Sequence, residues 1–517
     1  MRAILSPWDK QGLEPFARAL TELGFSLYAS TGTARFLRQA GLAVHDVSEL
    51  TAHPEMLGGR VKTLHPAIYA GLLADPTNPD HQAELAHHGY QPIGLVAVNL
   101  YPFRQTVEAP GVPLAHALEN IDIGGVSLLR AAAKNFPHVI PVVDPADYPL
   151  VIERLQHHTD DAVWRRAMAA KALRHVAAYD AQIAAYLGGA ADTLPETLPL
   201  ALTKLRDLRY GENPHQQAAL YADTPNPHLA ATVAGVRQHH GRELSFNNIL
   251  DVDAALACVR DFAAPCVAII KHGNPCGLAC AGELAEAYRK AHAGDPISAF
   301  GGAVGLNRIV DPTTARLIAE SHYDDIIAPG YADEALAILR KKRNLRILEV
   351  APLSEDQAGP AINPFLELDL RRISGGFLVQ TRDAIPENAV SLKTVTAREP
   401  TPEELADLLF AWRAVKHVRS NAIVLARERA LVGVGAGQMS RVDAVDIAVR
   451  KAGDRAAGSV LASDAFFSHP DGPELAAQAG VTAIIQPGGA LHDQEIIDVA
   501  NRFHLAMVFT GYRHFRH

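Results

Sequence analysis

A lysine, a histidine and two cysteines lie close together in residues 268–280, which read AIIKHGNPCGLAC. Lys271 and His272 can move a proton or polarise a carbonyl group. They stand at the carboxyl end of a predicted buried strand, the edge where open α/β sheets bind their ligands. A lone Lys-His pair is more often a surface feature, but the Gly273-Asn274-Pro275 turn would hold both side chains at a defined edge. We therefore treat Lys271 and His272 as candidate catalytic residues.

The cysteines do not have the spacing of a metal or redox site. The chain has four: Cys258, Cys266, Cys276 and Cys280. Only the last two have a ligand-like spacing, and no second pair matches them. Three intervening residues also differ from the two of a redox pair. Zinc deaminases carry His-x-Glu shortly before Pro-Cys-x-x-Cys, whereas His53-Pro54-Glu55 lies far away in this chain. We expect small, buried, reduced cysteines and no metal.

Hydroxyl and basic residues in the first part of the chain are candidates for binding an anion. Residues 30–37, STGTARFL, place Ser30 to Thr33 between a predicted strand and a helix. Free backbone N–H groups there would cradle an anion, although simple N-capping by Thr31 or Thr33 explains the pattern equally well. Residues 58–66, GGRVKTLHP, add Arg60 and Lys62, which are either a solvated basic loop or part of the same phosphate site.

Two further patterns have a common structural explanation and a rarer functional one. Asp122 precedes two glycines and Lys134 follows on a predicted helix; such residues are usually a surface pair, but in a cleft they can move protons. Residues 432–438 contain Gly433, Gly435 and Gly437, a Gly-x-Gly-x-Gly pattern. This is not the dinucleotide fingerprint, which has Gly-x-Gly-x-x-Gly and an acidic residue about 20 positions later.

The predicted elements indicate an α/β protein of more than one domain. Short apolar runs alternate with helical patterns in residues 1–195, which predicts a parallel, doubly wound sheet. Residues 187–203 are rich in Gly, Ala, Pro and Thr and mark the boundary. Residues 200–517 repeat a strand, loop and helix unit, which suggests two related subdomains with a junction near residue 365.

Composition excludes several classes of protein. The 517 residues carry a net charge of −9 and are 48% hydrophobic. No basic run suggests a nucleic-acid partner, and no apolar run approaches the roughly 18 residues of a membrane span. The N-terminal residues lack the apolar core of a signal peptide, so we expect a cytoplasmic protein that does not bind membranes.

Ordered motifs along almost the whole chain resemble one known family. They read GGRVKTLHP, NLYPF, IDIGG, LRYGENPHQ, ELSFNNILD, KHGNPCG, SAFGG, IIAPGY, KHVRSNAIV, GAGQMSRVD, SDAFF and the terminal RHFRH. The chain is similar to the bifunctional purine biosynthesis proteins that join AICAR transformylase to IMP cyclohydrolase. The resemblance implies an N-terminal methylglyoxal-synthase-like α/β domain and then two cytidine-deaminase-like α/β subdomains without zinc. It also implies a homodimer.

The resemblance implies two sets of site residues. The cyclohydrolase set is Ser30, Thr31, Gly32, Thr33, Arg60, Lys62, Thr63, Asn99, Tyr101, Asp122, Gly124 and Lys134; its catalytic members are Lys62, Tyr101, Asp122 and Lys134. The transformylase set is Arg209 (or Arg206), Tyr210, Lys271, His272, Gly301, Asp324, Asn421, Arg441, Phe466, Asp471, Arg513 and His517; its catalytic members are Lys271, His272 and Asn421. The arginines Arg209, Arg441 and Arg513 are candidates for phosphate and carboxylate.

The expected activity follows from this resemblance. Formyl passes from 10-formyltetrahydrofolate to AICAR, giving FAICAR, and ring closure with loss of water then gives IMP. Trp8 stands where the family has a small hydroxyl residue, and the sequence also departs from the family at Ser468-His469 and at residues 490–492, near the expected folate pocket. A nicotinamide oxidoreductase and a non-catalytic nucleotide sensor remain as alternatives; the first lacks a dinucleotide fingerprint, and the second would explain residues 30–33 alone.

Overall fold

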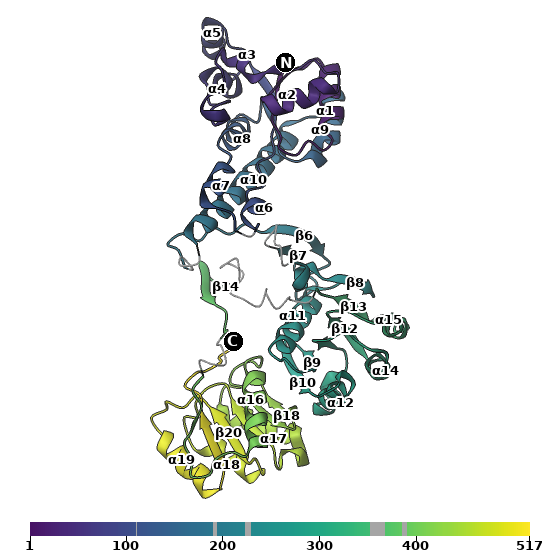
Figure 1. Cartoon of the computed structure of the whole chain (residues 1–517), viewed down its shortest axis with the longest axis vertical. Coiled ribbons are helices and arrows are strands. Elements are labelled where there is room, and N and C mark those ends of the chain that lie inside the picture. The colour runs from purple at the N-terminus through teal and green to yellow at the C-terminus, as the bar shows by residue number, and fades with distance from the viewer. Residues whose placement is uncertain (110, 190–193, 223–228, 352–367, 385–389) are drawn as a thin grey trace. The chain divides into compact units, whose positions relative to one another are not determined.

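The chain folds into two compact units, Met1–Leu202 and Thr203–His517. The computed structural model describes all residues except 110, 190–193, 223–228, 352–367 and 385–389. The junction predicted near residue 365 therefore lies outside the described residues. Figure 1 labels the helices of the N-terminal unit and many of the helices and strands of the C-terminal unit. Among the described helices, none is both long and apolar enough to cross a membrane.

The N-terminal unit is built on a parallel sheet with the strand order β3-β2-β1-β4-β5. The strands are β1 (Arg2–Leu5), β2 (Ser26–Ala29), β3 (His45–Asp46), β4 (Ile93–Ala97) and β5 (Ile140–Val142). Successive residues of β1 face opposite sides, so Ala3 and Leu5 pack into one buried cluster and Ile4 into another. Because both faces are covered, β4 and β5 are buried along their whole length, and the predicted doubly wound architecture is confirmed.

Helices cover both faces of this sheet. In chain order they are α1 (Leu13–Glu22), α2 (Thr31–Gln39), α3 (Val47–Thr51), α4 (Pro66–Leu73), α5 (Pro79–His87), α6 (Phe103–Val107), α7 (Leu114–Glu119), α8 (Gly124–Lys134), α9 (Tyr148–Gln156) and α10 (Ala162–Gly188). Several begin where the sequence provides a cap. Asp161 accepts from the backbone of Trp164 at the start of α10, and Asn78 accepts from Asp80 at the start of α5.

The C-terminal unit contains a twelve-stranded mixed sheet within its described residues, in the order β16-β21-β20-β19-β17-β18-β10-β9-β11-β12-β13-β8. Its strands are β8 (Arg237–His240), β9 (Cys266–Lys271), β10 (Asn274–Cys280), β11 (Gly302–Leu306), β12 (Tyr323–Ala328), β13 (Arg346–Glu349), β16 (Lys393–Thr394), β17 (Ile423–Arg427), β18 (Ala430–Gly435), β19 (Val460–Ser463), β20 (Ala483–Gln486) and β21 (Ala506–Phe509). Two separate hairpins pair β6 (Thr203–Leu208) with β7 (Ala218–Ala222) and β14 (Leu368–Ile373) with β15 (Gly376–Thr381).

The large sheet consists of two similar halves, as the sequence predicted. In each half an antiparallel hairpin, β9–β10 or β17–β18, is followed by a strand antiparallel to its first member and then by two parallel strands. The halves meet where β10 runs antiparallel to β18, with Ala279 opposite Ala430. The repeated unit is therefore one supersecondary arrangement used twice.

The helices repeat in the same way. The first half has α11 (Phe246–Arg260), α12 (Leu284–Gly294), α13 (Pro296–Ala299), α14 (Pro312–Glu320) and α15 (Asp333–Leu339), and the second has α16 (Pro402–Val415), α17 (Arg441–Ala452), α18 (Asp471–Gln478) and α19 (Asp493–Arg502). Helices α11 and α16 contribute to one buried cluster shared by both halves, whereas the opposite face carries two separate clusters. Three of the cysteines, Cys258, Cys266 and Cys280, are buried free thiols in the shared cluster, and Cys276 is partly buried.

The central hairpins, β9–β10 and β17–β18, each turn through two residues in the left-handed region. His272 and Gly273 have φ of 52° and 73°, and Glu428 and Arg429 have φ of 53° and 55°. These values fit a two-residue turn of type I′, whose twist matches that of the strands. The predicted Gly273-Asn274-Pro275 turn is therefore wrong by one residue. The turn is His272-Gly273, and Pro275 lies inside β10 next to an irregularity in its pairing with β9.

Glycines allow α12 and α17 to pack closely on the central strands. A methyl group at Gly435 would collide with the carbonyl oxygen of Ala444 in α17, and one at Gly277 would collide with that of Ala291 in α12. These positions accept no larger residue unless the helix moves away from the strand.

Gly435→Ala should therefore lower the free energy of unfolding of the C-terminal unit by about 1–3 kcal/mol, the usual cost of overpacking. Urea unfolding of the full chain measures this. Gly282→Ala is the matched control, because a methyl group there would meet nothing within 4 Å. Equal unfolding midpoints for the two variants would contradict the close approach.

Candidate active sites

The first candidate site lies at the carboxyl ends of β1, β2 and β4. The strand order reverses between β1 and β4, and open α/β sheets bind ligands at such a point. Ser6 Oγ, just after β1, donates to Ser30 Oγ at 2.9 Å, and Ser30 Oγ lies 3.5 Å from Thr33 Oγ1. Ser30 is the N-cap residue of α2 but makes no side-chain cap bond. This geometry favours the anion cradle over simple capping, because the first backbone N–H groups of α2 lack a side-chain cap.

Two of the predicted phosphate ligands, Thr31 and Arg60, contact carboxylate side chains. Thr31 Oγ1 donates to Glu55 Oε1, and Arg60 forms an ion pair with Glu119 on α7. Hydrogen bonding within this pair raises the pKa of Arg60 and lowers the pKa of Glu119, although both side chains are exposed and water screens their attraction. Arg60 would therefore exchange Glu119 for a bound phosphate at little cost.

Asn99 connects the loops that follow β1 and β4. Its Oδ1 accepts from the backbone N–H of Asp9 at 2.8 Å, and its Nδ2 donates to the carbonyl of Asp9 at 3.1 Å. Its own carbonyl also accepts from the N–H of Trp8 at 3.4 Å. The side chain of Asn99 thus fixes the loop that carries Trp8, which is 50% exposed beside the cradle.

Asp122 lies at the start of α8 among groups that affect its charge. Burial raises the pKa of Asp122, while a hydrogen bond of 2.7 Å from the N–H of Gly125 and the Lys62 ammonium oppose that rise. Burial also raises the pKa of Tyr101, with smaller contributions from the charges of Asp122 and Glu55. The site therefore holds a carboxyl group and a phenol that both keep their protons more readily than in water.

Close packing and a buried phenol fix the backbone around Asp122. The hydroxyl of Tyr179, on α10, accepts from the N–H of Asp122 at 2.7 Å and donates to the carbonyl of Asn120 at 3.1 Å. A methyl group at Gly124 would lie 2.7 Å from Thr63 Oγ1, so the buried Thr63 closely approaches the start of α8. Sequence reasoning missed Tyr179, because it lies in a long helix far along the chain from Asp122.

Lys134 is not brought close to Asp122 within one chain. It is exposed at the last residue of α8, whereas Asp122 precedes the first. At 1.5 Å per residue, the length of α8 puts about 15 Å along the helix axis between the two ends. The lysine that acts electrostatically on Asp122 is Lys62.

The second candidate site is built on the His272-Gly273 turn of the C-terminal unit. Asp251, on α11, accepts from the N–H of Gly273 at 2.7 Å, which fixes the turn and leaves the His272 side chain exposed. Lys271 Nζ donates to the carbonyl oxygens of Phe300 and Gly301, each at 3.0 Å. The predicted residues Lys271, His272 and Gly301 therefore lie together. Sequence reasoning did not assign Asp251, although it lies within the ELSFNNILD motif.

A buried acid, Asp464, organises the loop around Asn421. Arg441 donates through Nη1 to Asp464 Oδ1 and to Ser463 Oγ, the latter at 2.8 Å, and through Nη2 to Asn421 Oδ1 at 2.8 Å. Ser420 Oγ donates to the other oxygen of Asp464. Asn421 Nδ2 donates to the carbonyls of Gln438 and Met439, at 3.0 and 3.1 Å.

These bonds bear directly on the predicted role of Arg441. Its guanidinium already donates to Asp464, Ser463 and Asn421, so in this arrangement it positions Asn421. The side chain of Asp464 is fully buried. No spacing in the sequence distinguishes such an acid from an exposed one.

A hydrogen bond joins the His272-Gly273 turn region to the loop that carries Asn421. Asn274 Oδ1, just after the His272-Gly273 turn, accepts from the backbone N–H of Arg419 at 3.0 Å. The C-terminal residues reach the same region, because the N–H of His514 donates to the carbonyl of Asp464 at 2.8 Å and the N–H of Ser420 donates to that of Arg516. The first half of the sheet thus supplies Lys271 and His272, and the second half supplies Asn421.

The remaining predicted residues of the transformylase set are exposed or partly exposed. Arg209 lies over the ring of Tyr210, and Arg513 over the ring of Phe515, at 5.5 and 4.6 Å from the centroids. Asp324 lies 3.8 Å from His322, Phe466 is 37% exposed, Asp471 begins α18, and the His517 carbonyl accepts from Arg371. No hydrogen bond among the described residues joins Arg209, Phe466, Asp471 or His517 to the His272-Gly273 turn.

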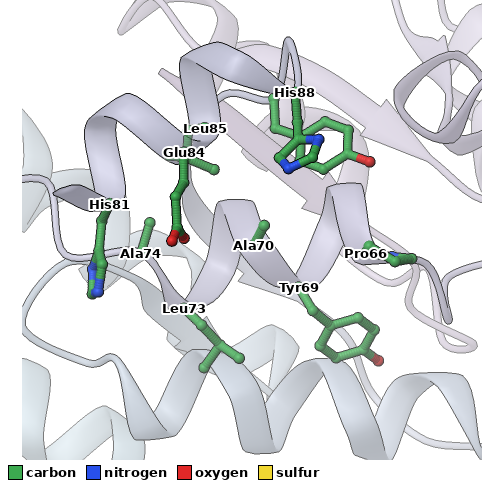
Figure 2. Close-up of a pocket in the computed structure, with 10 residues that line it drawn as sticks. Pro66, Tyr69, Ala70, Leu73, Ala74, His81, Glu84, Leu85 and His88 are labelled. Carbon is green, nitrogen blue, oxygen red and sulfur yellow. The ribbon is translucent and has the colours of Figure 1, made fainter.

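A cavity of about 470 Å³ lies between α4 and α5 of the N-terminal unit. Figure 2 shows Tyr69 and Leu73 on α4 and His81 and Glu84 on α5 lining it. None of the predicted site residues is among its lining residues.

The fold and the two sites define a bienzyme of α/β architecture, and comparison with known proteins identifies its family. The AICARFT/IMPCHase bienzyme family matches residues 132–451, and an MGS-like domain matches residues 12–127. The chain belongs to this family. It is a bifunctional enzyme of purine biosynthesis, with AICAR formyltransferase and IMP cyclohydrolase activities.

Relatives of similar length carry one name. The chain is 49% identical to the "Bifunctional purine biosynthesis protein PurH" of Anoxybacillus flavithermus, over 100% of this chain and 99% of that one. It is 50% identical to the protein of the same name from Myxococcus xanthus, over 100% of each chain. The match with the protein of that name from Listeria monocytogenes has 46% identity and also covers 100% of each chain.

Arg441→Met should destabilise the C-terminal unit by about 3–5 kcal/mol, because it leaves the buried Asp464 carboxylate without its cation. Thermal melting measures the change, and Arg450→Met, at an exposed position near the end of the same helix, is the control. A variant that melts like the parent and shows only a raised KM would instead make Arg441 an open anion ligand.

Proposed function

We propose that the N-terminal unit closes the ring of FAICAR to give IMP and that the C-terminal unit transfers the formyl group to AICAR. One observation supports the second assignment most strongly: the Lys271-His272 turn of one half lies against the Asn421 loop of the other, through the bond between Asn274 and Arg419. An exposed histidine, a lysine and an oriented amide are thereby gathered at one sheet edge.

Formyl transfer needs an acceptor for one proton and a stabilised oxyanion. The AICAR amine nitrogen attacks the formyl carbon, the bond from that carbon to N10 of the folate breaks, the amine loses a proton and N10 gains one. That amine is a poor nucleophile because the imidazole ring withdraws its electrons. We assign proton removal to His272, and stabilisation of the oxyanion to Lys271 and Asn421. Arg209 and Arg513 are exposed and can bind phosphate or carboxylate.

Ring closure needs an acid and a base that act on neighbouring atoms. The carboxamide nitrogen attacks the formyl carbon, and the formyl oxygen leaves as water. Asp122 and Tyr101, whose pKa values are raised by burial, are suited to donate and accept these protons, with Lys62 beside Asp122. The start of α2, with Ser30, Thr31, Gly32, Thr33 and Arg60, would bind the phosphate. Lys134 keeps a predicted role through the family resemblance alone.

The formyl donor, the assembly and the compartment belong to the same proposal. We assign 10-formyltetrahydrofolate as the donor, a homodimer as the assembly and the cytoplasm as the compartment, on the family resemblance described above. His469 and His492, at two of the departures from the family pattern, have ring centroids 6.0 Å apart. We propose that this histidine pair faces the folate.

His272→Ala should abolish formyl transfer and leave ring closure intact. Loss of a general base typically costs about 10²–10⁴-fold in rate. Each activity is assayed separately on the same sample, and a thermal melt checks folding. Lys62→Met and Lys134→Ala should each show the mirror pattern. A normally melting His272→Ala variant with near-parent transfer would refute the assignment, and a Lys134→Ala variant that still closes the ring would leave that role to Lys62.

The two activities should also separate when the chain is cut. We expect residues 1–199 to cyclise FAICAR and residues 200–517 to transfer formyl, because the contacts divide the chain close to this point. Circular dichroism establishes whether each fragment is folded. A soluble, folded 1–199 fragment without cyclohydrolase activity would contradict the boundary or the assignment.

A further inference from the structure

A buried acid that none of the assigned roles uses lies beneath the formyltransferase site. Asp325, on β12, is 1% exposed. In the sheet it is paired with Ala303 on β11 and with Arg346 on β13. On this face the same row of the sheet continues through Ile270, which precedes Lys271, and α11 covers it.

The carboxylate of Asp325 is only partly satisfied. Asn248 Nδ2 donates to Asp325 Oδ2 at 2.7 Å. Arg346 Nη1 lies 3.6 Å from Asp325 Oδ1, too far for a hydrogen bond, and Oδ1 accepts none from the described part of the chain. A buried oxygen left in this state costs stability, so the residue calls for a reason other than packing.

The duplicated architecture shows that the fold itself does not need this acid. The hairpin turns align Lys271 with Arg427, and the strand registers then align Asp325 with Ala483 and Arg346 with Ala506. Both alanines are fully buried. The second half thus builds the same place from two small apolar residues.

Two chains of contacts lead from Asp325 to the proposed formyltransferase site. Asn248 closes the capping box of α11 with Ser245, and Asp251, one turn further along α11, holds the N–H of Gly273. On the other side, Arg346 Nη1 donates to the carbonyl of Asp324 at 3.4 Å. The same acid therefore lies between the supports of the His272 turn and of Asp324.

We propose that Asp325 is a positioning residue of the formyltransferase: through Asn248 and α11 it places the Lys271-His272 turn, and through Arg346 it places Asp324. This inference rests on the proposed function of those residues. It gives the first half a device that the second half lacks, in keeping with the placement of Lys271 and His272 on the first half alone.

The charge of Asp325 should change near neutral pH. Burial raises its pKa to about 7, against the lowering effects of Arg346 and Asn248, while Asp324 and Asp251 raise it further. These are the charged and polar groups that face it from β13, from α11 and from its own strand. Above that pH the carboxylate attracts Arg346 and tightens the support of Asp324; below it the neutral acid keeps only the bond from Asn248.

The test compares kcat and the KM for AICAR in the full-length parent, Asp325→Asn and Asp325→Ala. Asp325→Ala should lose at least about tenfold in kcat/KM, since a misplacement of about 1 Å can cost 100-fold. Asp325→Asn resembles the neutral acid, so the parent-to-variant ratio should be near one at about pH 6 and rise severalfold at about pH 8. This ratio cancels any titration shared by both proteins.

Controls separate the possible failures. Asp333→Asn, at an exposed position on α15, should match the parent, and cyclohydrolase activity on each sample should be unchanged. Two results would overturn the inference. One is a folded Asp325→Ala variant with parent kinetics, and the other is a ratio of kcat/KM between the parent and Asp325→Asn that is the same at both pH values. If Asp325→Ala does not fold, the ratio alone decides. His272→Ala is assayed in parallel, and full formyl transfer by that variant would refute the proposed function. If His272→Ala loses formyl transfer but the ratio between the parent and Asp325→Asn does not change with pH, only the role of Asp325 is refuted.

Discussion

Strands β10 and β18 run antiparallel at the centre of the large sheet, with Ala279 opposite Ala430. This pairing joins two halves that would otherwise be separate α/β layers, and it lets α11 and α16 share one buried cluster. It also places the turn of the first hairpin against the loop before β17, where Asn274 accepts from Arg419. The formyltransferase site as we assign it requires both halves, so its geometry depends on this central pairing.

Anchoring of backbone by side chains recurs at each candidate site. Asp251 holds Gly273, Asn99 holds Asp9, and Tyr179 holds the N–H of Asp122. Asp251 and Tyr179 fix the main chain next to His272 and at Asp122, which we assign to catalysis, and Asn99 is itself an assigned residue that fixes the loop after β1. Such supports limit the motion of the reacting groups, which lowers the entropic cost of reaching the transition state.

The sequence predicted the architecture well, because periodicity and apolar runs report burial directly. It predicted a strand before Lys271 and two related halves, and both are present. It misplaced the turn by one residue, because Gly-Asn-Pro is a strong turn signal, whereas nothing in the local sequence required His272 to adopt a positive φ. It also gave no sign that Arg441 is occupied by Asp464, since an ion pair between residues 23 positions apart depends on the tertiary fold. Lys134 and Asp122 are separated because they lie at opposite ends of α8. Exact predicted bounds for this helix would have revealed the separation.

The two hairpin turns are held in the same way. Asp251 is the sixth residue of α11 and accepts from Gly273; Asp407 is the sixth residue of α16 and accepts from Glu428 and Arg429. Capping boxes open both helices, with Ser245 and Asn248 in one and Thr401 and Glu404 in the other. The two halves thus agree in detail, and only the first of the two turns carries a histidine. The Glu428-Arg429 turn has the same backbone support but no histidine. A protein engineer could therefore place a second reactive side chain at this turn.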